Sequence, residues 1–417
     1  AQDMAVTNGT VVIGDGSAPI EQGTVLVRGG EVVAAGRGIA IPPGVRTIDA
    51  KGGWITPGLF VAMTDLGLSD VEMVDDANDA SAAKAPFGAA FDIAPAINPA
   101  ATPVPVVRGG GVTRSAVAPA ASGSIFAGQG AVIDLGSDPA PVTRARAFQF
   151  VELGEKGARI AGGSRAAAIV TLRNSLDEAR ELARRGAVAG LTAAERPGDS
   201  LLNRADAAAL IPVVTGRQQL FVHVERAADI RMVLALRQDY PALRLVLVGA
   251  NEGWLAAREI AAAGVPVIAN GLNDLPDSFE SLGATQSNIG RMAAAGVKVA
   301  IGNLHGESQA RYARQYAGNL VGLARVPRAS GLTWAKAFAA ISAVPAEILG
   351  LGDSHGSLRP GRAGDVVVWD GDPLEVTSAP TAVFIDGTEQ SLASHQTRLR
   401  DRYRDLDESD LPKGYDW

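Results

Sequence analysis

Few residues of this 417-residue chain are able to do acid–base or metal chemistry. The four histidines are His223, His305, His355 and His395. The chain contains no cysteine, which excludes disulfides, zinc-thiolate sites and cysteine nucleophiles. A hydrolytic zinc site needs three protein ligands and an open position. His223 would therefore have to converge with Asp65 and with one of His305 or Glu252 on a single ion.

Three residues are candidates for catalysis: Asp65, His223 and His305. His223 ends the apolar run 220–222, which predicts a strand whose end lies at the mouth of a barrel. An ordinary hydrogen-bonded core histidine is the alternative. Asp65 either faces the same mouth or only caps the turn that follows it. His305 lies in the turn 302–306 and is a candidate general base if its ring points into the mouth.

Further residues follow predicted strands at the same face, and we expect them to contact a substrate. Glu225 and Arg226 come directly after the strand of His223, although a buried ion pair would explain these two residues equally well. The complete predicted binding set is Met63, Glu225, Arg226, Asn251, Glu252 and Asn303.

The elements that must position these residues alternate between strand and helix. Strands are predicted at 220–224, 245–249, 265–269 and 297–301, and helices at 175–185, 227–238, 254–263, 287–295 and 312–322. This alternation implies parallel pairing and favours a closed α/β barrel of the TIM-like (β/α)8 type. A second barrel strand is predicted at 110–119, and the glycine-rich segment 121–130 is expected to be a mobile loop. The segment 69–105 has little periodicity and is expected to form a lid over the mouth.

The two ends of the chain have a different, two-residue periodicity. Short strands separated by Gly, Pro and Asp are predicted at 11–13, 25–27, 32–34, 45–48, 365–369 and 382–385. Arg28-Gly29-Gly30-Glu31 predicts a tight hairpin turn. We expect residues 1–56 and 358–393 to form one composite β-sandwich, residues 57–357 the barrel, and residues 394–417 a charged surface helix and tail.

Two stretches carry a resemblance to a known family. The segment Pro57-Gly58-Leu59-Phe60-Val61-Ala62-Met63-Thr64-Asp65 resembles the first barrel strand of the amidohydrolase superfamily, which usually reads Pro-Gly-Leu-Ile-Asp-x-His-x-His. Residues 349–374 resemble the return from barrel to sandwich in imidazolonepropionase-like amidohydrolases. On this pattern Met63 and Asp65 occupy the positions of the two metal-binding histidines, and Val61 that of the aspartate.

The resemblance implies one or two metal ions held by histidines on the first, fifth and sixth strands, a lysine or glutamate in mid-barrel and a final aspartate. His223 matches the fifth-strand histidine. The other positions fall near Gly249-Ala250-Asn251 and Asn303-Leu304, and the bridging lysine or glutamate is unplaced. We therefore predict that the metal site is largely lost, that no cofactor is needed, and that the protein binds a ligand or a partner. The alternative is a working hydrolase of carbon–nitrogen bonds in cyclic amides or peptides, with a rebuilt or metal-free acid–base site.

Composition limits the partners. The formal net charge is −7 with an isoelectric point of about 5.3, so nucleic acids and anionic membranes are not expected partners. No nucleotide-binding glycine fingerprint and no Gly-x-Ser-x-Gly motif adjoins a strand. The start Ala1-Gln2-Asp3 resembles a cleaved secretory end, which predicts an exported or periplasmic protein, and otherwise a cytoplasmic one. We expect a small-molecule ligand in the barrel mouth and a homo-oligomer, or a hetero-oligomer with a metal-retaining homologue.

Overall fold

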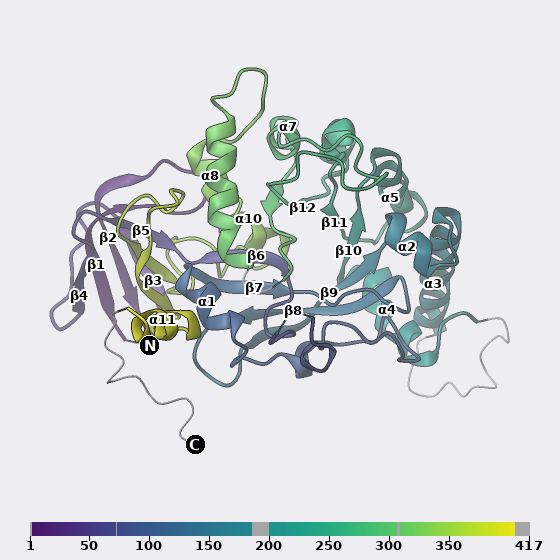
Figure 1. Ribbon diagram of the computed structural model, residues 1–417, viewed down its shortest axis with the longest axis horizontal. Helices are drawn as coiled ribbons and strands as arrows, with labels where there is room; N and C mark the ends of the chain where they lie inside the picture. Colours follow the sequence, from purple (N-terminus) through teal and green to yellow (C-terminus); the bar gives the residue numbers. More distant parts are fainter. Residues whose placement is uncertain (1, 72, 186–199, 307–308, 405–417) are drawn as a thin grey trace.

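The computed structural model describes residues 2–71, 73–185, 200–306 and 309–404, and these build two eight-stranded sheets with helices (Figure 1). Ala1 of the predicted processed end and the tail beyond residue 404 lie outside this range. The middle of the chain forms a barrel, and both chain ends form the second sheet. None of the helices in these ranges is long and apolar enough to cross a membrane.

The barrel sheet runs in chain order. Its strands are β6(Leu59–Thr64), β7(Val112–Val117), β8(Phe126–Asp134), β9(Val142–Glu152), β10(Gln219–Val224), β11(Leu245–Gly249), β12(Val267–Ala269) and β13(Val299–Ile301). A parallel bridge from Ala62 to Gly302 joins the first strand to the last, which closes the sheet. The predicted TIM-like barrel is confirmed.

One strand breaks the parallel pattern. β8 pairs antiparallel with both β7 and β9, and it begins inside the glycine-rich segment that we expected to be a loop. Gly130 faces the Phe148 ring so closely that a Cβ atom there would lie 2.1 Å from the ring. Glycine is therefore needed here for close packing rather than for loop freedom. The prediction of a mobile loop at 121–130 is wrong for residues 126–130.

The segment predicted as a lid also differs from expectation. From Ala80 to Ala101 it packs on the outer side of the barrel sheet, where Ile93 and Ile97 join the same apolar layer as Ile133 and Val151. The backbone N–H of Ile93 bonds to the carbonyl of Gln129 on β8. No helix directly follows β8, so this segment covers its outer face instead.

Helices surround the barrel, and α2, α3 and α5 lie together on the side of β9 and β10 (Figure 1). α3 starts ten residues earlier than predicted, and α4 contains Pro212, which concealed it in the sequence. The helices are α1(Pro103–Gly109), α2(Gly154–Ile160), α3(Arg165–Arg185), α4(Arg204–Val214), α5(Ala227–Asp239), α6(Ala257–Ala263), α7(Asn288–Ala294), α8(Ala313–Leu323), α9(Trp334–Ala339), α10(Ala343–Ile348) and α11(His395–Arg402). Short 3-10 turns are η1(Asp75–Ala77), η2(Ala94–Ala96), η4(Gly253–Ala256) and η5(Gln309–Tyr312).

The second sheet combines strands from both chain ends, as predicted. Its strands are β1(Met4–Val11), β2(Ile20–Arg28), β3(Glu31–Gly36), β4(Arg46–Asp49), β5(Trp54–Pro57), β14(Val366–Trp369), β15(Pro380–Ile385) and β16(Thr388–Gln390). β5 pairs antiparallel with β14, and the Arg28–Glu31 hairpin turn forms between β2 and β3. Arg114 on β7 reaches Asp365 at 2.8 Å and Asp386 at 2.7 Å, which ties the barrel to this sheet.

The inside of the barrel is filled with apolar side chains. Phe60, Phe148, Phe221, Val246 and Ile268 belong to one buried cluster, and the rings of Phe148 and Phe221 stack at 4.1 Å. Side chains alternate along a strand, so the residue two positions after Phe221 also faces inward. This residue is His223, at the end of β10 where the packed core stops and the mouth begins.

Candidate site at the barrel mouth

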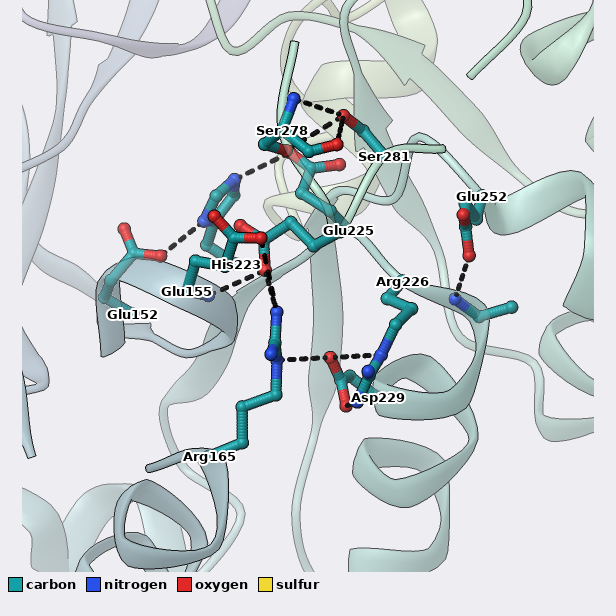
Figure 2. Close-up of polar contacts among 12 residues, drawn as sticks. Glu152, Glu155, Arg165, His223, Glu225, Arg226, Asp229, Glu252, Ser278 and Ser281 are labelled. Atoms are coloured by element: carbon teal, nitrogen blue, oxygen red, sulfur yellow. Dashed lines mark hydrogen bonds and ion pairs between the residues drawn. The ribbon is translucent and has the colours of Figure 1, made fainter. Parts of the chain in front are cut away.

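His223 lies between two carboxylates at the mouth (Figure 2). Its Nδ1 atom is 2.5 Å from Oε1 of Glu152, which sits opposite it on the parallel neighbour β9. Its Nε2 atom is 2.9 Å from Oε1 of Glu225. The side chains of Glu152 and Glu225 are 6% and 11% exposed, so both carboxylates are largely removed from water. Both ring nitrogens are thus occupied by acceptors.

The protonation of His223 follows from this geometry. Burial alone would lower the pKa of the imidazole, but the carboxylates of Glu152 and Glu225 outweigh burial and hold the pKa well above 6.5. An imidazolium donates one N–H to each carboxylate, and neither nitrogen then has a lone pair. The arrangement is a partly buried imidazolium paired with two carboxylates.

Glu225 is held in position from two further directions. Its Oε2 atom accepts the backbone N–H of Asn251 at 2.8 Å. Gly249, with φ of +84°, ends β11 beside it, and a Cβ atom at this position would lie 2.4 Å from Oε1 of Glu225. Glycine leaves the space that the carboxylate occupies. The predicted residues His223, Glu225 and Asn251 therefore form one hydrogen-bonded chain.

A loop over residues 270–287 is fastened beside this chain. Glu280 accepts the backbone N–H of Glu155 at 2.7 Å and lies 3.3 Å from the Arg165 guanidinium. Burial raises the pKa of Glu280, while the Glu155 N–H opposes that shift. Arg165 also pairs with Asp229 at 3.2 Å, so the loop is linked to α3 and α5 through charged groups (Figure 2).

Asp65 and His305 lie on the other side of the mouth, after β6 and β13. The carboxylate oxygens of Asp65 accept the backbone N–H of Gly306 at 3.1 and 3.2 Å, so its side chain binds across the barrel closure rather than capping its own turn. Nε2 of His305 is 3.0 Å from Oδ1 of Asn303. These three predicted residues are thus brought together.

His305 has the opposite titration behaviour to His223. Desolvation lowers its pKa; Asp65 opposes this, and His223 and Lys156 lower it further through their positive charge. These interactions also place both histidines within electrostatic reach of each other across the mouth.

Three other predicted binding residues have structural partners instead. Arg226 pairs with Asp229 at 2.7 Å within α5 and its flank. Glu252 accepts the backbone N–H of Ala227 and of Gly283, both at 2.9 Å, and so fixes the start of α5 and the end of the 270–287 loop. Met63 is fully buried in the apolar filling of the barrel.

The backbone is strained at the positions where the family pattern expects ligands. Met63, Ala250 and Asn303 have φ of 63°, 51° and 59°, in the left-handed region that non-glycine residues rarely adopt. Each such residue costs on the order of 1–3 kcal/mol, and such strain is concentrated at functional sites. These three residues therefore share a left-handed backbone conformation at or next to the ends of their strands.

The donor set at the mouth does not fit the family's metal centre. Met63, Ala250 and Leu304 offer no oxygen or imidazole nitrogen from their side chains, and both nitrogens of His223 face carboxylates. Across the described ranges, no group of three or more His, Asp or Glu side chains is arranged to hold a metal ion.

Sequence reasoning missed Glu152, Glu280 and Arg165. Glu152 ends β9, which pairs with the histidine strand β10, whereas the resemblance implied a lysine or glutamate only somewhere in mid-barrel. The alternating run Phe148-Gln149-Phe150-Val151-Glu152 before Gly154 was the available signal. Glu280 gave no signal, because it lies in a long loop and meets Glu155 125 positions away.

Comparisons with known proteins agree with this architecture. Residues 287–389 match the model of the amidohydrolase family. An amidohydrolase from Thermotoga maritima has a TM-score of 0.81 at 22% identity, over 93% of this chain and 99% of its own. A molinate hydrolase gives 0.58 at 17% identity, over 94% and 95% of the two chains. The N-isopropylammelide isopropylaminohydrolase of Burkholderia multivorans gives 0.54 at 16% identity, over 94% and 100%.

The fold and the mouth define a closed α/β barrel carrying a composite β-domain. The sequence of residues 287–389 is similar to the amidohydrolase family, and the fold of most of the chain is similar to that of solved amidohydrolases. The curated amidohydrolase tasK of Hapsidospora irregularis is 47% identical over 60 residues, which are 14% of this chain. The match spans 6% of the length of that relative.

Proposed function

We propose that this protein uses the amidohydrolase barrel to bind a small polar molecule at its mouth without a catalytic metal ion. The observation that carries the proposal is the pairing of both His223 nitrogens with Glu152 and Glu225. A metal ligand must present a nitrogen lone pair, and an imidazolium has none.

Three features support a binding role for the mouth. Met63, Ala250 and Asn303 have left-handed backbone at or beside three strand ends, and such strain is common at functional sites. Asp65, Glu152 and Glu225 supply carboxylates, while His223 and the nearby Lys156 supply positive charge. We infer a ligand with N–H donors, such as an amide or amine, because three carboxylate side chains lie at the mouth. An association with a metal-retaining homologue remains a prediction.

Metal analysis tests the proposal. The wild type and the His223→Ala variant are purified without chelator, incubated with Zn²⁺, Mn²⁺ or Fe²⁺, and desalted. Elemental mass spectrometry then measures the number of metal ions bound per chain. We expect well below one ion per chain in both proteins. One tightly held ion per chain in the wild type, lost in His223→Ala, would overturn the proposal.

A second function is favoured by the opposite pKa shifts of two histidines. His223 and His305 lie on opposite sides of the mouth; the raised pKa of His223 keeps its ring protonated, and the lowered pKa of His305 leaves its ring able to accept a proton. This division suits hydrolysis of a carbon–nitrogen bond without metal. The test is a panel of cyclic amides, dipeptides and lactones with wild type, His223→Ala and His305→Ala. Activity that is equal in all three proteins would end this alternative.

A further inference from the structure

A cavity lies at the seam between the barrel and the composite domain. It measures about 260 Å³ and is lined by Gly110, Arg311, Tyr312, Arg314, Gln315 and Val376. Gly110 connects α1 to β7, the next four residues belong to η5 and the first turn of α8, and Val376 lies in the loop between β14 and β15. Among the described residues, the lining contains two guanidinium groups and no carboxylate.

Neither arginine forms an ion pair within the described residues. Arg311 donates to Oε1 of Gln396 at 3.2 Å and to the Tyr312 hydroxyl at 2.7 Å, and both acceptors are neutral. Its Nε atom is buried and makes no hydrogen bond in that part of the chain. A buried donor without an acceptor destabilises the folded protein. The cavity is thus short of negative charge.

The guanidinium of Arg314 also has no anionic partner among the described residues. Its Nη1 donates to the carbonyls of Pro373 at 3.2 Å and Glu375 at 2.8 Å, and its guanidinium lies over the Trp369 ring. Burial lowers the pKa of Arg314, while the more distant Asp370 only partly offsets this. These contacts fix the guanidinium in place but do not neutralise it.

We propose that this cavity is a binding site for a small oxyanion, a phosphoryl or carboxylate group, held between Arg311 and Arg314. The planar guanidinium matches the geometry of both groups. The Tyr312 hydroxyl accepts from Arg311, so its own proton is free to donate to the same anion. A volume of about 260 Å³ admits the oxyanion with a few further atoms. This site is separate from the mouth and does not depend on its proposed function.

Isothermal titration of the full chain with inorganic phosphate, and separately with succinate, in a low-salt chloride buffer tests the site and distinguishes the two anion classes. We expect saturable 1:1 binding of at least one of them. Arg311→Gln and Arg314→Gln should each weaken it about tenfold or more, the loss expected for a charge-assisted hydrogen bond. Absence of saturable binding by either anion overturns the proposal.

Matched variants distinguish anion binding in the cavity from a general effect of the protein's positive charge. Arg325→Gln removes the same charge at an exposed position after the other end of α8 and should change affinity less than about twofold. Val376→Trp keeps every charge and fills the cavity from an exposed position, so it should abolish binding even if Arg314→Gln does not fold. An equal loss of anion affinity in Arg325→Gln and Arg314→Gln would contradict the proposed site. Unchanged affinity in Val376→Trp would also contradict it.

Discussion

Glu152 and His223 face each other across the parallel strands β9 and β10, with Oε1 of the glutamate 2.5 Å from Nδ1 of the histidine. With Glu225 on the other nitrogen, the ring connects two carboxylates that water barely reaches. At a histidine position that the family pattern assigns to a metal ligand, both ring nitrogens are therefore paired with carboxylates.

Removing the cation should destabilise the protein. In His223→Gln the carboxylates of Glu152 and Glu225 remain close together without a positive partner, and breaking a buried charge pair in this way costs about 3 kcal/mol. Urea unfolding measures the change. His395→Gln on α11 is the control, and because that side chain is exposed we expect a change below about 0.5 kcal/mol. Similar values for both variants would contradict the buried cluster.

The contribution of His223 should also depend on pH. Its folded pKa lies above the unfolded value of 6.5, so the stabilisation is complete below pH 6.5 and is lost as pH rises through the folded pKa. The difference in unfolding free energy between wild type and His223→Gln should therefore be largest in mild acid and decline in alkali. A difference in unfolding free energy that increases with pH would contradict this prediction.

Arg114 should be the main polar link between barrel and composite domain. The side chains of Arg114 and Asp365 are 3% and 6% exposed, so Arg114→Met leaves a buried carboxylate and should cost about 3–5 kcal/mol. Asp386→Asn touches the same arginine from an exposed position and should cost no more than about 1 kcal/mol. Thermal unfolding of both variants measures the two losses of stability. A larger loss in Asp386→Asn than in Arg114→Met would contradict this prediction.

The same link predicts an acid dependence. Burial alone would raise the pKa of Asp365, but Arg114 outweighs burial and lowers it. The stabilisation is thus present above the unfolded pKa of 3.8 and is lost as pH falls through the lower folded pKa. The stability gap between wild type and Asp365→Asn should narrow in strong acid, and acid titration followed by circular dichroism measures it. A gap that widens there would contradict the pairing.

Glu280 should hold the 270–287 loop against α2. Glu280→Ala removes the acceptor of the Glu155 N–H and the partner of Arg165, so amides of the loop should exchange hydrogen faster. Hydrogen-exchange mass spectrometry measures this locally. Glu259→Ala on α6, which removes an exposed partner of Arg231, should leave the loop unchanged. Unaltered loop exchange in Glu280→Ala would mean that other contacts hold the loop.

The barrel was predictable wherever strands are short, apolar and buried on both faces. The runs ending at Val224 and Gly249 are of this kind, and their parallel pairing followed from the helices between them. β8 and β9 were not predictable in the same way. Gly128 and Gly130 resemble loop residues, and Arg144 and Arg146 occupy the exposed first half of β9 and hide its alternation.

The site was predictable only where it lies on strands. His223 follows Phe221 at the strand period, so its inward direction could be derived from the sequence. Its partners could not be derived, because Glu152 depends on recognising β9 and Glu280 comes from an irregular loop. The ion pair between Arg226 and Asp229 is local in sequence, yet nothing in the sequence alone separates it from a substrate contact.

Nitrogen NMR of the His223 ring, assigned with His223→Gln and recorded at pH 7.5 before and after one equivalent of Zn²⁺, tests the account most directly. We predict that both ring nitrogens carry protons and that zinc leaves their resonances unchanged. One unprotonated nitrogen whose resonance shifts stoichiometrically with zinc would contradict the account and make His223 a metal ligand.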